Sequence, residues 1–233
     1  MEYNVPSLLN KPMRIAILFS GGKDSTFALY WAVQQGWDIC CLVSLMPSRS
    51  DSWMFHTPNI QFVRQQAEAL GLPLVAQATS GEKEKELDDL KKALQKAKDD
   101  YKIDGVVAGA LASDYQQERV NRICEDLKLK TFAPLWHKDQ DRLLREMIEC
   151  GFEIIIQHIA AEGLSEKWLG RRMDKECYDD LLVLHQKFGM NPAGEGGDDR
   201  LRRRDHHLGG PDRRNHNRPG RVRGPGDKHR LRR

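Results

Sequence analysis

Short apolar runs and amphipathic stretches alternate along the first 130 residues of the chain. The continuous apolar runs predict buried strands, and stretches with apolar residues at helical spacing predict the helices between them. The expected strands span residues 14–19, 38–45, 74–78 and 105–108, and the expected helices span residues 26–35, 60–70, 84–99 and 115–127. The connections are long enough for right-handed crossovers. The pattern therefore predicts an α/β fold in which a parallel sheet is flanked by helices.

A weaker pattern of the same kind follows the fourth expected strand and helix. Helical periodicity is found over residues 139–150 and 174–187, with a strand-like stretch at residues 153–159. We interpret residues 134–197 as a smaller C-terminal α/β unit packed on a domain of residues 13–133. Residues 1–12 are interpreted as an N-terminal extension, because Met13 directly precedes the first strand and is a candidate start.

A glycine-rich loop, Ser20-Gly21-Gly22-Lys23-Asp24-Ser25, joins the first expected strand to the first expected helix. It lies at the carboxyl end of the sheet, where open α/β folds bind ligands. The glycines let backbone N–H groups face an anion, and the helix N-terminus, capped by Asp24 or Ser25, adds partial positive charge. Lys23 and the two serine hydroxyls match phosphate oxygens. A carboxylate beside phosphates is repelled unless a cation lies between them, so we assign Asp24 to Mg²⁺.

The spacing of this loop is not that of a Walker A motif. It resembles the SGGxDS signature of the PP-loop ATP pyrophosphatases, whose fold is of the adenine nucleotide alpha hydrolase type. Further segments resemble one PP-loop family, the diphthine–ammonia ligases and their archaeal relatives, and the likeness covers residues 13–197. These segments are residues 82–86 (EKEKE), 109–113 (GALAS), Tyr115 and Gln116 with Arg119, residues 134–136 (PLW) and residues 194–197 (GEGG).

The resemblance implies an ATP-dependent amide ligase. Such an enzyme adenylates the carboxylate of diphthine on translation elongation factor 2 and amidates it with ammonia, releasing AMP and pyrophosphate. ATP and Mg²⁺ are the implied cofactors, and the implied partners are elongation factor 2 and ammonia. The loop of residues 20–25 is expected to bind ATP, and the implied catalytic residues are Lys23, Asp24, Glu84, Arg119 and Glu195. The implied substrate-binding residues are Tyr115, Gln116, Arg119, Gly196 and Gly197.

Several of these residues also have a simpler interpretation. Glu82, Glu84 and Glu86 are typical of a solvated helix start, yet the resemblance leads us to expect at least one to face the nucleotide or ammonia. Arg119 is either a solvated helix arginine or a clamp for phosphate or carboxylate. On the long loop after the second strand, Trp53 and His56 are either loop residues or a cover for adenine.

The five cysteines, at positions 40, 41, 124, 150 and 177, form no C-x-x-C pair. This usage favours buried thiols in a reducing cytoplasm over disulfides or a zinc site. No secretory signal and no apolar run of membrane-spanning length is found near the N-terminus. Adjacent Cys40 and Cys41 do not match the paired cysteines of sulfur-transferring PP-loop enzymes. Another PP-loop activity such as tRNA modification, or a nucleotide-binding module without turnover, remains the alternative function.

The composition changes abruptly after Gly197. Residues 198–233 contain twelve Arg and one Lys against five Asp, a charge of +8, which leaves −5 on residues 1–197 of the formal total of +3. We expect this tail to be disordered, because it contains too few apolar residues to offset the entropy of ordering it. It departs from the family pattern in a way that suggests a shifted reading frame. The alternative is a basic arm that attracts RNA.

Overall fold

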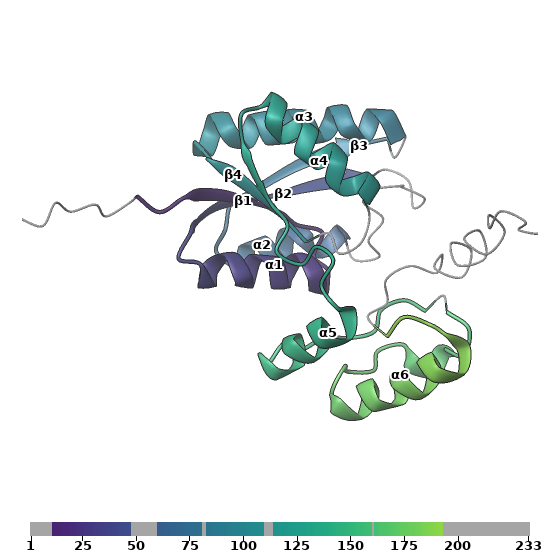
Figure 1. Cartoon of the computed structure of the whole chain (residues 1–233). Coiled ribbons are helices and arrows are strands. Elements are labelled where there is room, and N and C mark those ends of the chain that lie inside the picture. Colours follow the sequence, from purple (N-terminus) through teal and green to yellow (C-terminus); the bar gives the residue numbers. More distant parts are fainter. Residues whose placement is uncertain (1–10, 48–59, 81–82, 110–113, 160, 193–233) are drawn as a thin grey trace, which may run out of the picture. The chain divides into compact units, whose positions relative to one another are not determined.

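The computed structural model describes residues 11–47, 60–80, 83–109, 114–159 and 161–192 (Figure 1). The expectations for Trp53, His56, Glu82 and residues 193–233, which include Glu195, Gly196 and Gly197, lie outside the described residues. For Glu84, Tyr115 and Gln116 the structure describes the backbone alone. Among the described residues, no helix is long and apolar enough to cross a membrane.

The centre of the fold is a five-stranded sheet in the order β3-β2-β1-β4-β5, and all four neighbouring pairs of strands are parallel. The strands are β1 (Arg14–Leu18), β2 (Asp38–Pro47), β3 (Leu74–Thr79), β4 (Gly105–Ala108) and β5 (Lys130–Phe132). The α/β class and the four expected strands are confirmed. The fifth strand was not predicted, because three residues, two of them polar, carry too little periodicity to be recognised.

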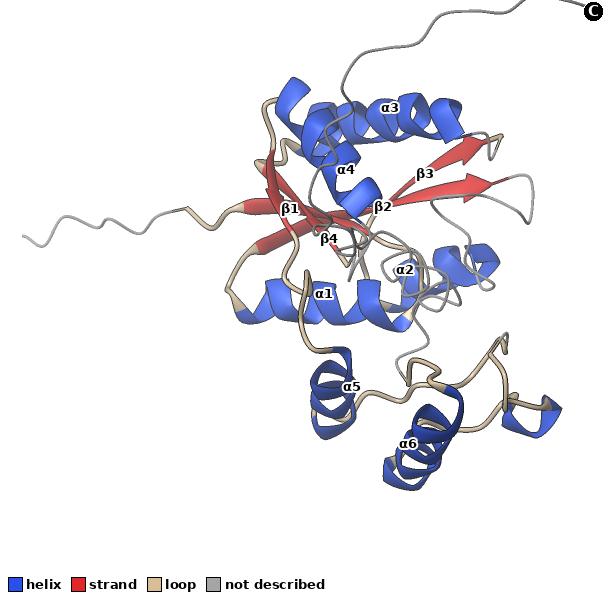
Figure 2. Cartoon of the chain, turned by 45° about the vertical axis from the view of Figure 1, so that its right-hand side comes forward, coloured by secondary structure: helices blue, strands red, loops and turns tan. Residues whose placement is uncertain are grey.

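Helices cover both faces of the sheet (Figures 1 and 2). They are α1 (Lys23–Gln34), α2 (Val63–Ala69) with the preceding 3₁₀ turn η1 (Ile60–Phe62), α3 (Lys83–Tyr101) and α4 (Asp114–Asp126). One apolar cluster joins the strands to α3 and α4, and a second joins them to α1 and α2. Because both faces are covered, Ile15, Ala16 and Ile17 of β1 are all fully buried. This double burial explains why the strands are continuous apolar runs rather than alternating ones.

Among the described residues beyond the sheet, the regular elements are the helices α5 (Gln140–Glu149) and α6 (Lys175–Phe188) and the 3₁₀ turn η2 (Glu166–Trp168), joined by irregular segments. The strand expected at residues 153–159 is wrong. Ile155 forms one isolated antiparallel bridge with Arg172, flanked by backbone hydrogen bonds such as the 2.7 Å bond from the Met173 N–H to the Ile154 carbonyl. The apolar run there supplies core side chains, Ile154 and Ile156 among them, rather than a paired strand.

The buried thiol of Cys41 should make the stability of the fold depend on pH in the alkaline range. Burial raises the pKa of Cys41 to about 12, whereas an exposed cysteine has a pKa of about 8.5. Between these values the unfolded chain releases a proton that the folded chain keeps, so the free energy of unfolding falls by about 1.4 kcal/mol per pH unit. Urea titrations from about pH 9 to about pH 11 should therefore show a steeper loss of stability in the wild type than in Cys41→Ala. Equal slopes in the two proteins would contradict this protonation account.

Candidate functional site

The glycine-rich loop follows β1, at the point where the order of the strands reverses. From β1 the chain builds outwards to β2 and β3 on one side, and then to β4 and β5 on the other. Open parallel sheets bind ligands in the crevice at such a switch point, beyond the carboxyl ends of the strands. The end of β1 is held in place by the Phe19 backbone, whose N–H donates to the Val43 carbonyl at 2.8 Å and whose carbonyl accepts from the Ser44 hydroxyl. The loop therefore begins at a residue whose backbone is held by two hydrogen bonds to β2.

The backbone of the loop leads directly into α1, which begins at Lys23 rather than at Thr26 as the sequence suggested. Gly21 has a φ of +76°, the left-handed region that favours glycine. The N-cap is Gly22, which has no side chain to cap the helix, so the expectation that Asp24 or Ser25 caps α1 is wrong. Both residues lie inside the first turn instead. An uncapped helix N-terminus after a glycine turn is typical of anion sites, because its N–H groups remain available to a ligand.

The serine hydroxyls of the loop form hydrogen bonds within the loop itself. The Ser20 hydroxyl donates to Ser25 Oγ at 3.2 Å, and the Ser25 hydroxyl donates to the Gly22 carbonyl at 3.0 Å. The Ser20 N–H also donates to Ser25 Oγ, at 3.3 Å. These bonds link Ser20 to Ser25 across the turn, and Ser25 is buried. In this structure the two serines shape the loop, and their direct contact with phosphate stays a prediction.

Lys23 and Asp24 form the charged part of the site. Lys23 Nζ lies 2.6 Å from Asp24 Oδ2, and the two side chains are 19% and 20% exposed. The other carboxylate oxygen, Asp24 Oδ1, is buried and has no hydrogen-bond partner among the described residues. A buried acceptor without a donor fits a cation, and one carboxylate supplemented by phosphate oxygens is a usual environment for Mg²⁺. The described residues contain no cluster of three metal-binding side chains, so Mg²⁺ here would depend mainly on the phosphates.

The end of β4 touches the beginning of α1 at Gly109. A Cβ atom built on Gly109 would lie 2.8 Å from the Asp24 carbonyl oxygen and 2.9 Å from Ser25 Cα. Only a residue without a side chain allows this approach of two backbones. Gly109 therefore sets the distance between the fourth strand and the glycine-rich turn.

Gln66 on α2 also contacts the loop, and the sequence did not predict this contact. Its Nε2 donates to the Gly21 carbonyl at 3.0 Å, although 45 residues separate the two in the sequence. The sequence pattern does not distinguish Gln66 from its neighbour Gln65, which is exposed. Only the tertiary contact with the loop identifies Gln66.

The other predicted residues that the structure describes lie on α3 and α4, helices that follow β3 and β4 as α1 follows β1. Glu86, in the first turn of α3, is fully buried, so a solvated side chain is ruled out for this glutamate. Arg119 lies in the second turn of α4 and is partly buried. The helical backbone of α4 places positions 115, 116 and 119 on one face, as expected from their spacing. Their roles toward a ligand stay predictions.

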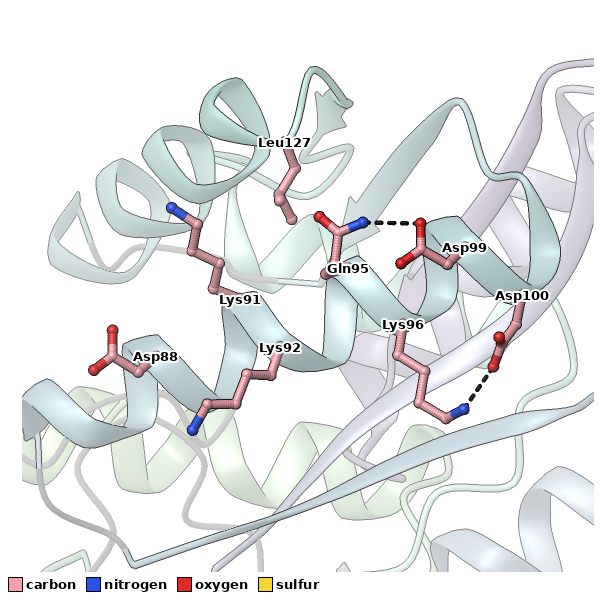
Figure 3. Close-up of a pocket in the computed structure, with 8 residues that line it drawn as sticks. All are labelled: Asp88, Lys91, Lys92, Gln95, Lys96, Asp99, Asp100 and Leu127. Carbon is pink, nitrogen blue, oxygen red and sulfur yellow. Dashed lines mark hydrogen bonds and ion pairs between the residues drawn. The ribbon is translucent and has the colours of Figure 1, made fainter.

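A charged hollow of about 610 Å³ lies elsewhere, along α3 and against Leu127 (Figure 3). Its lysines have carboxylate partners: Lys91 Nζ lies 2.6 Å from Asp126, and Lys96 Nζ lies 2.6 Å from Asp100. Both pairs are exposed, one between α3 and α4 and one within α3, and such pairs are typical of solvated helix surfaces. We therefore assign no ligand to this hollow.

A glycine-rich turn between the first strand and first helix of a parallel sheet is characteristic of α/β proteins that bind phosphate groups. Comparison with known proteins gives the particular family. The model described as the diphthamide synthase N-terminal domain matches residues 13–131, and the model of the diphthamide synthase C-terminal domain matches residues 139–201. The chain belongs to the diphthamide synthase family, as the sequence motifs suggested.

Curated relatives agree with this assignment. The chain is 37% identical over 206 residues to a mouse protein named diphthine–ammonia ligase, a match that covers 80% of this chain and 76% of the mouse protein. It is 38% identical over 205 residues to the zebrafish diphthine–ammonia ligase, covering 80% of each chain. The human diphthine–ammonia ligase is 35% identical over 206 residues, with 80% of this chain and 76% of the human protein covered.

Proposed function

We propose that this chain is an ATP-dependent ligase that amidates the carboxylate of diphthine on translation elongation factor 2 with ammonia. The observation that carries the proposal is the glycine-rich turn with Lys23 and Asp24 at the switch point of the sheet. This turn lies in a chain whose relatives are named diphthine–ammonia ligases. The class, an enzyme that forms a C–N bond, follows from the family.

The chemistry requires activation because a carboxylate is a poor electrophile. In the first step a carboxylate oxygen of diphthine attacks the α-phosphorus of ATP, the bond from that phosphorus to the bridging oxygen breaks, and pyrophosphate leaves. In the second step ammonia attacks the acyl carbon, the acyl–oxygen bond breaks, AMP leaves with the electron pair, and the nitrogen loses a proton. The products are the amide, AMP and pyrophosphate.

The loop suits the first step, in which negative charge develops on the leaving pyrophosphate. The N-terminus of α1 and the Lys23 ammonium place positive charge at the turn, and such preorganised groups stabilise developing charge by several kcal/mol. Asp24, with its unpartnered Oδ1, would hold Mg²⁺. When bound, this ion neutralises phosphate charge.

The second group of residues would act on the carboxylate and ammonia. We assign Arg119 to a clamp on phosphate or on the diphthine carboxylate, because a guanidinium binds such anions through two parallel hydrogen bonds. Glu84 retains its proposed catalytic role, and buried Glu86, two residues further along α3, joins it as a candidate to face the nucleotide or ammonia. Substrate contacts are assigned to Tyr115, Gln116, Gly196 and Gly197, and a catalytic role to Glu195.

The cysteines argue against sulfur transfer to RNA as the alternative. Cys40 is partly buried, and Cys41, Cys124 and Cys177 are buried. Cys150 is exposed, so the expectation of buried thiols is wrong for this one residue. Burial raises the pKa of the thiols of Cys40, Cys124 and Cys177 and brings the pKa of Cys41 to about 12. Because the thiolate is the nucleophile in sulfur chemistry, these residues are poorly suited to that role at neutral pH. Cys41, Cys124 and Cys177 are core residues, and Cys150 has no second cysteine at C-x-x-C spacing.

The proposal predicts AMP formation that depends on the protein substrate. Labelled ATP is incubated with the full chain, ammonium and elongation factor 2 that carries diphthine, and AMP and pyrophosphate are measured. We expect both products in equal amounts. The matched control is elongation factor 2 that already carries diphthamide, whose amide offers no carboxylate to adenylate. AMP at the same rate with both forms would contradict the proposal, and so would ATP binding without AMP, which would indicate a nucleotide-binding module.

A further inference from the structure

The carboxamide of Gln66 lies across Gly21 and contacts it at two points. Its Nε2 donates to the Gly21 carbonyl at 3.0 Å. Its Oε1 lies against the α carbon, so close that a Cβ atom built on Gly21 would be 2.2 Å from it. Val63, one turn earlier on α2, would be 3.1 Å from the same Cβ atom. Helix α2 therefore covers one side of the turn. A side chain at position 21 would displace the Gln66 carboxamide, and it is disfavoured by the φ of +76°.

The hydrogen bond to Gly21 determines the orientation of the next N–H group. A peptide unit is planar and trans, so the Gly21 carbonyl and the Gly22 N–H point in opposite directions. Gln66 holds the carbonyl on the α2 side, and the Gly22 N–H consequently faces away from α2. Its acceptor there is Ser20 Oγ at 3.4 Å, a long and weak contact. This N–H group is therefore directed toward the inside of the turn and is only weakly engaged.

The orientation of the Gln66 carboxamide is set by its hydrogen bond to Gly21 and not by any bond to its oxygen atom. Gln66 Oε1 is buried and has no hydrogen-bond partner among the described residues. A buried acceptor without a donor has a cost, and swapping the two ends of the amide would bring its oxygen against the Gly21 carbonyl oxygen. The donation to Gly21 thus fixes the orientation of the amide at the expense of Oε1.

We propose that Gln66 is a positioning residue for the phosphate-binding turn. It holds the Gly21–Gly22 peptide in the orientation that presents the Gly22 N–H to the β,γ-phosphates, and it couples the position of α2 to the turn. This inference rests on the proposed use of ATP. It predicts that the effect of Gln66 appears in the binding of any ligand that carries the pyrophosphate group.

The first test compares two neighbouring glutamines on the same helix. Gln66→Met keeps the size of the side chain and removes its hydrogen bonds, while Gln65→Met makes the same change at an exposed position. Titration calorimetry measures the Kd of each folded protein for MgATP and for pyrophosphate. We expect Gln66→Met to bind both ligands about tenfold more weakly than the wild type, with Gln65→Met unchanged. A folded Gln66→Met that binds like the wild type would overturn the inference.

The second test separates the hydrogen bond from general packing. In Gln66→Glu an ionised carboxylate cannot donate to the Gly21 carbonyl, whereas a protonated one can. The affinity for ATP relative to the wild type should therefore be low near pH 8 and recover toward about pH 5.5 as the carboxyl group takes up its proton. Gln66→Met should show no recovery. A ratio for Gln66→Glu that is independent of pH would overturn the inference even if Gln66→Met does not fold.

The wild-type measurement keeps the two proposals distinct. If the wild type binds neither ATP nor pyrophosphate, the proposed function fails, and the role of Gln66 fails with it. If the wild type binds both ligands and the Gln66 variants bind equally well, the positioning role alone is wrong.

Discussion

Replacing Lys23 with methionine should reduce kcat/KM for ATP in the AMP-forming assay by a factor of about 100 or more. The ammonium group of Lys23 is the one side-chain cation of residues 20–25, and the Lys23 side chain is only 19% exposed. Without it the leaving pyrophosphate loses a charge partner in a site with limited access to water, where such interactions are strong. Methionine retains most of the length of the side chain, so the loss reports the charge rather than a cavity.

The matched control is Lys92→Met on α3, within the charged hollow of Figure 3. Lys92 is 67% exposed on its side chain and pairs with Asp89 at 3.1 Å within its own helix. Exposed pairs of this kind contribute little to stability, so this variant should retain the kinetic constants of the wild type. Equal activity of the two variants would contradict the assignment of the turn to phosphate binding.

Replacing Gly109 with alanine should lower both stability and activity. The new methyl group would meet the main chain of Asp24 at 2.8 Å, and backbone atoms cannot rotate away as a flexible side chain does. Either β4 or the N-terminus of α1 must shift. We expect the free energy of unfolding to fall by about 2 kcal/mol. We also expect kcat/KM for ATP to fall under conditions in which the variant is still folded, because the turn itself moves.

Gly36→Ala separates these two effects. Gly36 has a φ of +71°, and a Cβ atom there would meet no atom within 4 Å. Alanine at this position should cost about 1 kcal/mol through backbone strain alone, at the far end of α1 from the turn. Urea titration and AMP assays on both variants should show lost stability in each, but lost activity only in Gly109→Ala. Full activity in Gly109→Ala would show that the contact with Asp24 does not position the site.

The parts of the fold that could be predicted from sequence are those whose signal is local. The apolar run of β1 and the glycines after it predict a buried strand that enters a tight turn, and the structure contains both. Strand β5 and the single bridge at Ile155 were not predictable, because pairing in a sheet depends on the neighbouring strand. The start of α1 at Lys23 was misplaced because the N-cap is a glycine without a capping side chain.

The same distinction applies to the site. The glycine-rich turn was predictable because it is a continuous segment of sequence, and the roles of Lys23 and Asp24 toward phosphate and Mg²⁺ stay predictions. Gln66 was not, since its contact with Gly21 spans 45 residues. The burial of Glu86 is hidden in the sequence by charged neighbours that resemble a solvated helix face. Only the folded structure shows that Glu86 is fully buried.

The central claim is the transfer of ammonia nitrogen to diphthine, and isotope incorporation tests it most directly. The full chain is incubated with ATP, ¹⁵N-ammonium and elongation factor 2 that carries diphthine, and the modified peptide is analysed by mass spectrometry. The account predicts one ¹⁵N atom in the diphthine side chain, dependent on ATP and strongly reduced with Lys23→Met. Unlabelled diphthine in the presence of a chain that is folded and binds ATP would contradict it.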